Sequence, residues 1–583
     1  MPPTEEELQA IAEARTAASA AIVASTSRRK LIVAGPGTGK TFTFKQALVQ
    51  CGQQGLALTF IRNLVRDLEA ALRDHADVFT FHGYCKHLLH ANPVVGLEDD
   101  WTYYPPLLQI LAKDHALLGR ADVEDSGTID RCLHDLDDAN GLIRETVRLG
   151  TYYNAVFHTD LVYRILKHFE TNGDDIRVYP LIVVDEYQDF SRLETSFIAL
   201  LASRSPVIIA GDDDQALYAF KNASARYIRE LANGVDYARF ELPYCSRCPQ
   251  VVVDAVRQVI VRAVQNGNLT GRLAKRYECY LPDKLTDSEA HPKIIHADCT
   301  VERTNAPYIG RYIVEQLRAL PLADIRQSHD AGDPTALVIG PMPFIRSAYD
   351  RIHDAYPQAV WKKSAQPEIN ALDAYRRLAR NERSRLGWRI LIALQPFQDS
   401  DSILADVLDT ETELADRIPA DYKAIHLQLA ALVGRLLDEG ELTEVEAQQL
   451  QTATSMTHEQ LRNILHVDES EEDEPPPEVP RDTPTIVCTS LVGAKGLSAG
   501  YVFIVGFNNG HFPRDPNSIT DEEVCSFLVG LSRTRKECHV VSCRRFAGTW
   551  LQSSKFGDWI SDKIEHLLVN RDWFQNRPAP AAG

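Results

Sequence analysis

Short hydrophobic runs rich in β-branched residues alternate with helix-like stretches in two parts of the chain. The runs of the first part are residues 30–34, 56–60, 181–184 and 207–210, and those of the second part are 336–339, 485–489, 501–505 and 539–542. Runs of this kind, separated by helices, are typical of buried parallel strands in a sheet with helices on both faces. The pattern therefore predicts an α/β fold with two parallel-sheet domains.

A stretch with apolar residues at helical spacing interrupts each of these parts, at residues 92–160 and 372–466. We predict that both stretches are inserted helical subdomains, because their apolar positions recur at helical rather than strand spacing. The sheet domains then consist of residues 1–91 with 161–241, and of residues 242–371 with 485–583.

Residues 467–484 differ in composition from the rest of the chain, with many acidic residues and prolines and few hydrophobic ones. Such a segment buries too little apolar surface to offset the entropy lost when its backbone is ordered. We predict a disordered linker. The alternative is an acidic segment that imitates a nucleic-acid backbone and gates a binding groove.

Residues 34–41 read AGPGTGKT and fit the phosphate-binding loop pattern, with alanine in the first glycine position. Glycines let backbone N–H groups turn inward around an anion, and the following helix adds its positively polarised N-terminus. Lys40 is expected at the β- and γ-phosphates and Thr41 at a Mg²⁺ ion. The predicted nucleotide-binding residues of the loop are Gly35, Pro36, Gly37, Thr38, Gly39, Lys40 and Thr41.

Two acidic residues, Asp185 and Glu186, follow the hydrophobic run at 181–184. Carboxylates at the C-terminal edge of a parallel sheet face the crevice in which ligands bind. Asp185 is expected to hold Mg²⁺ through water, and Glu186 to orient and deprotonate the water that attacks the γ-phosphate. Together with the phosphate-binding loop, this pair indicates a nucleoside triphosphatase.

Composition narrows the class of protein. A chain of 583 residues is long enough for several domains, and 44% hydrophobic with 25% charged residues is ordinary for a soluble globular protein. No run approaches the ~20 apolar residues that cross a bilayer. The first residues are acidic, unlike those of a signal peptide, and the eleven cysteines are consistent with reduced, buried thiols. We expect a cytoplasmic protein that does not enter a membrane. The net charge of −19 disfavours nonspecific coating of nucleic acid but permits a locally basic groove.

Further motifs follow in an order that marks one family. They are TF at 59–60, TFH at 80–82, DEYQD at 185–189, GDDDQALYAF at 211–220, LPYCSRC at 242–248, TSLVGAKGL at 489–497 and GLSRTR at 530–535. In this order they resemble the motifs of UvrD/Rep-like superfamily 1 DNA helicases, of which the chain resembles a compact member. The resemblance implies two RecA-like domains that bind ATP and Mg²⁺ between them.

The resemblance also implies catalytic roles for three side chains. Gln215 would sense the γ-phosphate and report it to the DNA-binding surface. Arg247 and Arg533 would reach from the second domain to the phosphates. A planar guanidinium suits this role because it stabilises spreading negative charge without titrating.

A second group of residues matches the family positions that contact single-stranded DNA. Phe60, Tyr218 and Phe220 would stack on the bases or line their path, because stacking holds any base sequence. His82 would contact the backbone. Closing and opening of the cleft between the domains would drive the strand past these residues, in the 3′-to-5′ direction by resemblance.

Several positions depart from the family at the nucleobase end of the site. Phe42 stands where relatives have arginine, Ser246 where they have a stacking tyrosine, and Ser498 where a glutamate contacts the ribose. The glutamine that reads adenine is not at its usual spacing, and Gln9 is a distant candidate. Two interpretations stay open: base discrimination is relaxed, or Phe42 and Tyr244 rebuild an apolar sandwich around adenine.

These motifs predict an ATP-dependent DNA helicase or translocase that acts on single-stranded DNA or a tailed duplex, in repair, recombination or anti-phage defence. The alternative is a DNA-stimulated ATPase that regulates a partner nuclease and unwinds little alone, which the short helical inserts favour. An RNA helicase is a third alternative, because stacking does not separate RNA from DNA. Cys245 and Cys248 form a CxxC pair, which we interpret as buried thiols rather than a zinc or redox site.

Overall fold

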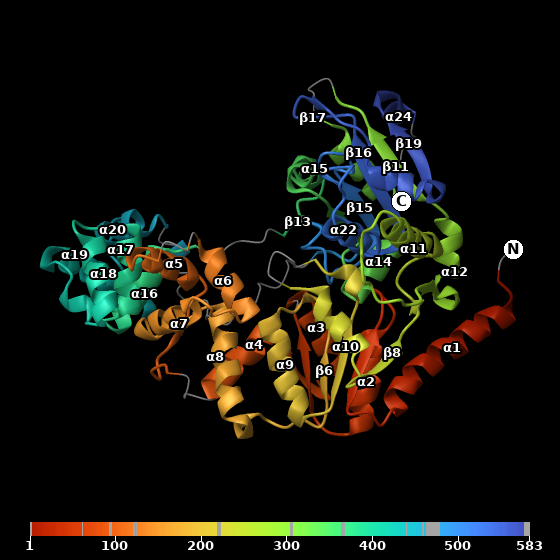
Figure 1. Cartoon of the computed structure of the whole chain (residues 1–583). Coiled ribbons are helices and arrows are strands. Elements are labelled where there is room, and N and C mark those ends of the chain that lie inside the picture. Colours follow the sequence, from red (N-terminus) through yellow and green to blue (C-terminus); the bar gives the residue numbers. More distant parts are fainter. Residues whose placement is uncertain are drawn as a thin grey trace.

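The computed structural model describes residues 3–60, 62–91, 96–120, 123, 125–217, 223–302, 307–362, 368–438, 440–456, 460–461 and 479–576. Two large parallel sheets and one helical body make up the molecule (Figure 1). The predicted fold class, α/β with two RecA-like parallel-sheet domains, is confirmed.

The first sheet has six parallel strands in the order β3-β2-β6-β7-β1-β8. Its strands are β1 (Arg29–Val33), β2 (Gly55–Thr59), β3 (Ala76–Thr80), β6 (Ile182–Val184), β7 (Val207–Gly211) and β8 (Ala238–Glu241). The helices that precede, connect or follow them are α1 (Glu5–Ala24), α2 (Lys40–Cys51), α3 (Arg62–Leu72), α4 (Phe81–Ala91), α8 (His158–Thr171), α9 (Arg192–Arg204) and α10 (Ala225–Asn233). The predicted hydrophobic runs form β1, β2, β6 and β7. The other two strands lie at the sheet edges, where half-exposed positions interrupt a hydrophobic run.

The second sheet has seven parallel strands in the order β13-β14-β12-β15-β16-β11-β19. Its strands are β11 (Ile294–Cys299), β12 (Ala336–Ile339), β13 (Val360–Trp361), β14 (Ile486–Thr489), β15 (Ala499–Val505), β16 (Thr534–Cys543) and β19 (Ile564–Val569). The helices of this part are α11 (Gln250–Gln265), α12 (Leu281–Ala290), α13 (Ile309–Arg318), α14 (Leu322–Ala331), α15 (Met342–Ala355), α22 (Asp521–Leu531), α23 (Lys555–Trp559) and α24 (Arg571–Gln575). Two-stranded pairs complete the strands: β4 (Thr102–Tyr103) with β5 (Ala155–Val156), β9 (Tyr244–Cys245) with β10 (Glu278–Cys279), and β17 (Arg545–Phe546) with β18 (Thr549–Trp550).

Parallel pairing places the functional motifs together. The interior strands β2 and β15 are buried along their whole length, as expected where helices cover both faces of a sheet. In a parallel sheet all strands end at the same edge. The phosphate-binding loop follows β1, Phe60 follows β2, Asp185 follows β6 and Asp212 follows β7, so four distant segments meet at one edge.

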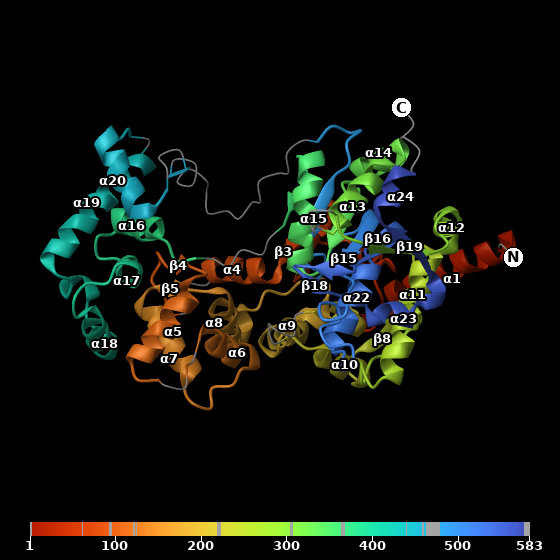
Figure 2. The same ribbon diagram turned by 90° about the horizontal axis from the view of Figure 1, so that it is seen from above.

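The two helical stretches share one hydrophobic core. The first provides α5 (Leu107–Leu117), α6 (Ser126–Asp135) and α7 (Leu142–Tyr152), and the second provides α16 (Ala371–Arg380), α17 (Arg385–Leu394), α18 (Ser400–Thr410), α19 (Ala420–Leu437) and α20 (Glu444–Thr454). In Figures 1 and 2 these helices lie together to one side of the sheets. A buried ion pair joins them, with Arg389 Nη2 2.7 Å from Asp114 Oδ1. The domain boundaries stay a prediction, but the two inserts pack as one body.

The predicted acidic linker falls mostly outside the described residues, which resume at residue 479. Its described end is tied to α14 by two exposed ion pairs. Arg481 Nη2 lies 2.5 Å from Asp330 Oδ2, and Arg326 Nε lies 2.6 Å from Asp482 Oδ1. Residues 481 and 482 thus pair with the second sheet domain.

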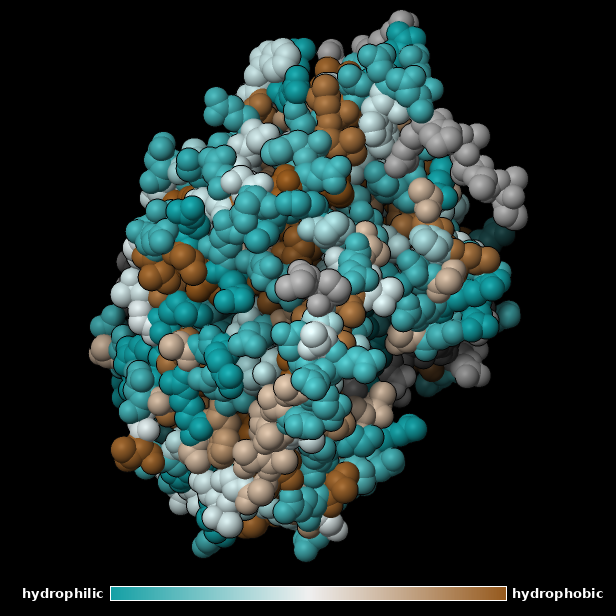
Figure 3. Space-filling view, turned by 90° about the vertical axis from the view of Figure 1, so that its right-hand side faces the viewer, coloured by the Kyte–Doolittle hydropathy of each residue, from teal (hydrophilic) through white to brown (hydrophobic). Residues whose placement is uncertain are grey.

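Hydrophobic residues on the face shown in Figure 3 occur in separate groups among hydrophilic ones. A groove between α1 and α2 is lined by the apolar residues Ala20, Val23, Ala24, Phe42 and Val49, together with Lys45, Gln46 and Gln50. Within the described part of the chain, every helix is too short or too polar to cross a membrane.

Candidate nucleotide-binding cleft

The phosphate-binding loop joins the end of β1 to the start of α2 at Lys40. Gly37 and Gly39 have φ angles of 70° and 93°, in the left-handed region that glycine adopts without a Cβ clash. A Cβ at Gly37 would lie 2.5 Å from the Cβ of Arg247, and Ser246 donates its N–H to the Gly37 carbonyl at 2.9 Å. The loop therefore requires glycine, and it contacts the segment that carries Arg247.

Lys40, Asp185 and Glu186 meet at the carboxyl edge of the first sheet. Lys40 Nζ lies 3.1 Å from Glu186 Oε1 and 3.8 Å from Asp185 Oδ1. Burial alone would lower the pKa of Lys40, but the two carboxylates outweigh it and the pKa is raised. Burial also raises the pKa of Asp185, with Lys40 opposing it.

Glu186 remains anionic in this surrounding. Burial would raise the pKa of its carboxyl, but Lys40 and Lys495 outweigh burial and hold that pKa below its ordinary range. A glycine loop, a buried ammonium and two carboxylates fit a nucleoside triphosphate with Mg²⁺. Lys40 would hold the phosphates, and Thr41 and Asp185 the ion.

A cleft of about 380 Å³ contains these groups. Its lining comes from both sheet domains and consists of Arg15, Pro36, Gly37, Thr38, Gly39, Lys40, Thr41, Phe42, Asp185, Glu186, Gln215, Ser246, Arg247, Gly496, Arg533 and Arg535. Gly35 lines a second cavity of about 280 Å³ behind the loop, where a Cβ at Gly35 would lie 2.6 Å from the Tyr277 ring. The tertiary structure thus collects residues from nearly the whole length of the chain into one nucleotide-sized space.

Arg533 and Arg247 enter the cleft from the second sheet domain. Arg533 is buried and donates from Nη2 to Gln215 Oε1 at 3.1 Å. Gln215 in turn donates from Nε2 to Asp212 Oδ2 at 2.5 Å. Arg247 donates from Nη1 to the Ser532 carbonyl at 3.5 Å. Burial and the nearby Arg247 lower the pKa of Arg533 to about 10, so Arg533 is charged at neutral pH.

Lys495 lies buried beside the cleft and was missed by sequence reasoning. Its Nζ donates to the Gln215 carbonyl at 2.6 Å and lies 2.5 Å from Asp189 Oδ2 and 3.8 Å from Glu186 Oε2. Gln188, also missed, donates from Nε2 to Glu186 Oε2 at 2.5 Å and accepts from the Asp212 N–H at 2.9 Å. Both residues lie within sequence motifs, Lys495 within AKG at 494–496 and Gln188 within DEYQD, and these motifs could have identified them.

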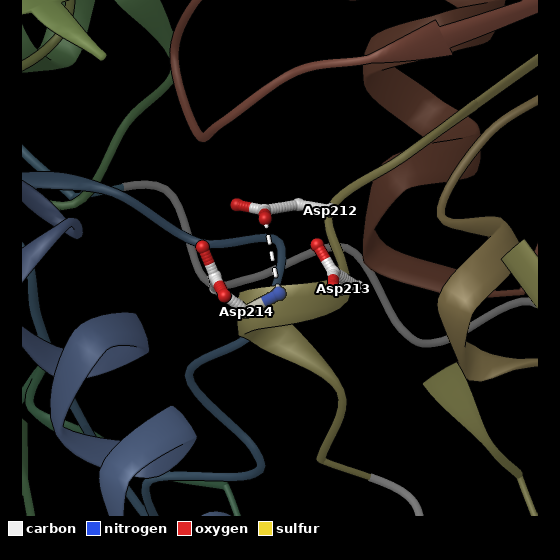
Figure 4. A group of neighbouring side chains, drawn as sticks. All are labelled: Asp212, Asp213 and Asp214. Atoms are coloured by element: carbon white, nitrogen blue, oxygen red, sulfur yellow. Dashed lines mark hydrogen bonds between the residues drawn. The ribbon is translucent and has the colours of Figure 1, made fainter. Parts of the chain in front are cut away.

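Asp212, Asp213 and Asp214 each place a carboxylate oxygen within 4.8 Å of the others, the spacing of a metal site (Figure 4). The Asp214 N–H donates to Asp212 Oδ1 at 3.1 Å. However, Lys275 Nζ lies 2.8, 2.9 and 2.7 Å from Asp212 Oδ1, Asp213 Oδ1 and Asp214 Oδ2. Arg229 also pairs with Asp213 at 2.9 Å, and Arg272 with Asp214 at 2.7 Å. Three cations already balance the three carboxylates, so a metal ion does not fit there.

The nucleobase end of the cleft contains Arg15, another residue that sequence reasoning missed. Arg15 lies in the middle of α1, and its Nη2 donates to Ser246 Oγ at 3.3 Å. Phe42 lines the same end and is 57% exposed. Gln9, the distant candidate for reading adenine, instead donates to Glu13 at 2.9 Å on the exposed side of α1.

The structure does not bring Tyr244 to this end of the cleft. Tyr244 is buried in β9 and is not one of the described residues that line the cleft. Phe42 and Tyr244 therefore do not form a sandwich in this conformation. Ser498, which stands at the ribose-contacting position, is buried and accepts from Arg535 Nε at 3.0 Å.

Cys245 and Cys248 have a third neighbour that their spacing did not reveal. The register of β9 and β10 pairs Cys245 with Cys279, and Cys279 Sγ donates to the Cys248 carbonyl at 3.4 Å. All three are buried, free thiols.

Phe60 and His82 lie side by side at the ends of β2 and β3. Their ring centroids are 6.2 Å apart in an edge-to-face arrangement, and Phe60 also meets the Phe190 ring edge-on at 5.6 Å. His82 Nε2 lies 3.7 Å from Glu194 Oε1. Tyr218 and Phe220, the other predicted DNA-contacting residues, lie outside the described residues.

Comparison with known proteins finds similarity to one family model and to several curated DNA helicases. Residues 17–221 match the family described as an AAA domain. DNA helicase II of Haemophilus influenzae is 24% identical over 285 residues, which is 41% of this chain and 39% of that protein. DNA helicase II of Rickettsia typhi is 24% identical over 344 residues, which is 49% of this chain and 49% of that protein.

ATP-dependent DNA helicase PcrA of Staphylococcus aureus is likewise 24% identical over 285 residues, which is 41% of this chain and 38% of that protein. The chain thus spans half or less of the length of these curated relatives.

Proposed function

Because this chain belongs to the UvrD/Rep-like superfamily 1 helicases, we propose that it is an ATP-driven translocase that moves along single-stranded DNA. One observation carries the proposal. Arg533 and Lys495 of the second sheet domain contact Gln215 and the DEYQD segment of the first, in the cleft that holds the phosphate-binding loop. A nucleotide in this cleft would therefore be contacted by both domains.

Each cleft residue then has a defined part in hydrolysis. Lys40 would bind the β- and γ-phosphates, and Thr41 and Asp185 would hold a Mg²⁺ ion, which would supply charge neutralisation there. Anionic Glu186 orients the attacking water and accepts its proton. Arg247 and Arg533 stabilise the charge that develops on the transferred phosphoryl group.

A short chain of contacts supports coupling between hydrolysis and the DNA-binding surface. Glu186 accepts from Gln188 in the DEYQD segment, and Phe190, one residue after that segment, packs edge-on against Phe60. Two noncovalent contacts and two peptide bonds therefore connect Glu186 to an aromatic ring proposed to stack on a base. We infer that Phe60 and His82 bind the strand, with Tyr218 and Phe220 completing the surface.

The similar proteins are DNA helicases, which supports DNA rather than RNA as the substrate. The 3′-to-5′ direction, the repair or defence setting, the cytoplasmic location and a partner nuclease stay predictions from sequence. Movement on a single strand and unwinding of a tailed duplex are separable activities, and the cleft supports the first.

ATP hydrolysis should be measured with and without single-stranded DNA, for the wild type, Glu186→Gln and the control Glu170→Gln. Glu170 is an exposed residue of α8 that pairs with Lys167. We expect strong stimulation by DNA, its abolition in Glu186→Gln at unchanged nucleotide binding, and wild-type behaviour of the control. A negligible wild-type rate with DNA present would contradict the proposal.

A second arm tests the coupling. Phe60→Ala should lower the DNA-stimulated rate at subsaturating DNA, because a stacking ring contributes ~1–3 kcal/mol per base. The rate without DNA should stay unchanged. Unwinding of duplexes with 3′ or 5′ tails then reports the direction.

A further inference from the structure

We propose that Cys245 and Cys248 form a reversible disulfide that switches off ATP hydrolysis, which makes this pair an oxidation-sensitive site behind the phosphate-binding loop. The effect on activity rests on the proposed ATP hydrolysis, but the site itself is a separate feature of the chain. The spacing of the two cysteines alone favoured ordinary buried thiols. Their contacts in the folded protein are the evidence for a redox pair.

The two sulfurs face each other across a short bend of the chain. Cys245 ends β9, and Cys248 precedes Pro249 and the start of α11. The Cys248 N–H donates to Cys245 Sγ at 3.4 Å, and the Cys248 thiol also hydrogen-bonds to that sulfur. A disulfide between side chains this close requires little movement of the backbone.

Cys245 is the nucleophilic partner of the pair. Burial would raise the pKa of its thiol, but hydrogen bonds from the Cys248 thiol, the Tyr277 hydroxyl and the N–H groups of Cys248 and Arg247 outweigh burial and lower that pKa. Burial raises the pKa of Cys248 well above its ordinary value, and the neighbouring Cys245 raises it further. A thiolate beside a thiol is the arrangement in which one sulfur is oxidised and the other then attacks it.

Cavities lie on two sides of this pair. Tyr277, whose hydroxyl oxygen lies 3.2 Å from Cys245 Sγ, lines the cavity of about 280 Å³. Ser246 and Arg247, the two residues between the cysteines, line the cleft of about 380 Å³. One layer of side chains thus separates the buried sulfurs from space that an oxidant as small as hydrogen peroxide can enter.

Hydrogen peroxide supplies a balanced route to the disulfide. The Cys245 thiolate attacks one peroxide oxygen and the O–O bond breaks, which gives a sulfenic acid and a hydroxide ion that takes up a proton to become water. The Cys248 sulfur then attacks the Cys245 sulfur and the S–O bond breaks, so that the sulfenic oxygen leaves as water with the thiol proton. The two thiols thereby lose two electrons to the peroxide, and an external dithiol reverses the reaction.

The pair contacts the phosphate-binding loop directly. A Cβ at Gly37 would lie 3.1 Å from Cys245 Sγ. The Tyr277 hydroxyl oxygen lies 3.2 Å from the same sulfur and 3.2 Å from the Pro36 carbonyl oxygen. When the Cys245 sulfur turns to bond Cys248, the packing behind the loop must therefore change.

The disulfide would also enclose Arg247, which lies between the two cysteines. Cys248 Sγ donates to the Ser532 carbonyl at 3.5 Å, and Arg247 Nη1 donates to the same oxygen at 3.5 Å. A disulfide has no thiol proton, so the carbonyl of the residue before Arg533 loses one of these two donors. Oxidation should thus displace both arginines that are proposed to stabilise the transferred phosphoryl group.

Peptide mapping locates the disulfide in the wild type itself. Trypsin cleaves after Arg247, between the two cysteines, and gives fragments 240–247 and 248–257. We would treat the full-length protein with hydrogen peroxide, block the remaining thiols, digest it without reductant and identify linked fragments by mass spectrometry. We expect these two fragments to stay joined and to separate after dithiothreitol. A blocked thiol at Cys248, or a link from 240–247 to the Cys279 fragment 277–284, would overturn the assignment.

The effect on activity is tested with ATP hydrolysis at saturating single-stranded DNA, before peroxide, after peroxide and after subsequent dithiothreitol. Cys245→Ser removes the nucleophilic sulfur, and Cys279→Ser is the matched control, because the register of β9 and β10 pairs Cys279 with Cys245. We expect the wild-type and Cys279→Ser rates to fall by about 10²-fold, the effect of displacing catalytic groups by about 1 Å, and to recover with dithiothreitol. Cys245→Ser should keep its own untreated rate, and thermal unfolding checks that each variant is folded.

Equal inhibition of Cys245→Ser and the wild type would overturn the proposed switch, as would inhibition that dithiothreitol does not reverse. The peptide mapping requires neither ATP hydrolysis nor DNA. It therefore decides whether the oxidation site exists even if the proposed function fails.

Discussion

Arg533, in the turn between α22 and β16, donates from Nη2 to Gln215 Oε1 at 3.1 Å, and this bond joins the two sheet domains beside the phosphate-binding loop. The bond places a buried guanidinium and a polar amide next to each other at the proposed γ-phosphate. If Arg533 stabilises the transferred phosphoryl group, its contribution belongs to the transition state rather than to binding.

Arg533→Ala should therefore lower kcat for ATP hydrolysis by about 10³-fold, the low end of the range for arginine fingers, with a much smaller change in KM. Steady-state kinetics with saturating DNA measures both constants. Arg533→Lys should recover little of the loss, because an ammonium lacks the planar fork that contacts several oxygens. A kcat within three-fold of the wild type for Arg533→Ala would remove this residue from the mechanism.

We predict that the buried Asp114–Arg389 pair stabilises the two helical inserts as one body. Both side chains are buried, and Tyr153 also donates to Asp114, at 2.7 Å. Arg389→Met leaves the Asp114 charge buried and uncompensated, so it should lower the free energy of unfolding by about 3–5 kcal/mol. Urea denaturation measures this change.

The control for that prediction is Arg383→Ala in the same body. Arg383 pairs with Asp416 at 2.8 Å, but both side chains are more than half exposed, so this change should lower the free energy of unfolding far less than Arg389→Met. If Arg389→Met and Arg383→Ala destabilise the protein equally, the buried pair does not hold the inserts together.

Glycine is required at position 37 for two reasons that can be separated. Gly37 and Gly52 have nearly the same φ angle, 70° and 69°. A Cβ added at Gly37 would clash with Arg247, whereas a Cβ added at Gly52 would meet no heavy atom within 4 Å. Both alanine substitutions should cost about 1–2 kcal/mol of stability from the left-handed backbone. Only Gly37→Ala should also abolish ATP hydrolysis, as measured by phosphate release. Full activity of Gly37→Ala would contradict the packing of the loop against Arg247.

The buried His296 should make the protein less stable in acid. Burial, followed by the neighbouring His566, lowers the pKa of His296 to about 4, while Asp298 opposes the shift. Between about pH 6.5 and 4 the unfolded chain binds a proton that the folded protein does not, so stability falls as the pH falls through this window. The contribution is on the order of 3 kcal/mol, because each pKa unit corresponds to about 1.4 kcal/mol.

His296→Gln removes this titration and keeps an amide near Ser542 Oγ, which lies 2.9 Å from His296 Nε2. The drop in unfolding free energy between pH 7 and pH 4.5 should therefore be smaller in the variant than in the wild type. Equal drops in the two proteins would show that His296 does not contribute to acid sensitivity.

Several features of the cleft could be predicted from sequence because they depend on local chemistry. The residues around Lys40 fix a strand, a glycine turn and a helix start within a few positions, and this loop is found as expected. The hydrophobic run before Asp185 predicts a buried strand with acids at its end, which β6 confirms. Parallel pairing then places both segments at one edge of the sheet.

Other features depended on contacts between segments far apart in the chain. Nothing in the sequence of α1 marks Arg15, whose position follows from packing against α12, more than 260 residues later in the chain. The sequence also left Tyr244 as a base-stacking candidate, because its residue type suits stacking, but the pairing of β9 with β10 buries it. The direction of a side chain is set by tertiary packing, not by residue type.

The sequence by itself determined the two parallel sheets, the phosphate-binding loop and the carboxylates beside it, because hydrophobic periodicity and glycine placement act within a short stretch of chain. Only the tertiary structure decided that the two helical inserts share one core, that Lys275 contacts three aspartates, and that Arg15 enters the cleft. These outcomes depend on the energy of contacts between distant segments, which local sequence patterns do not encode.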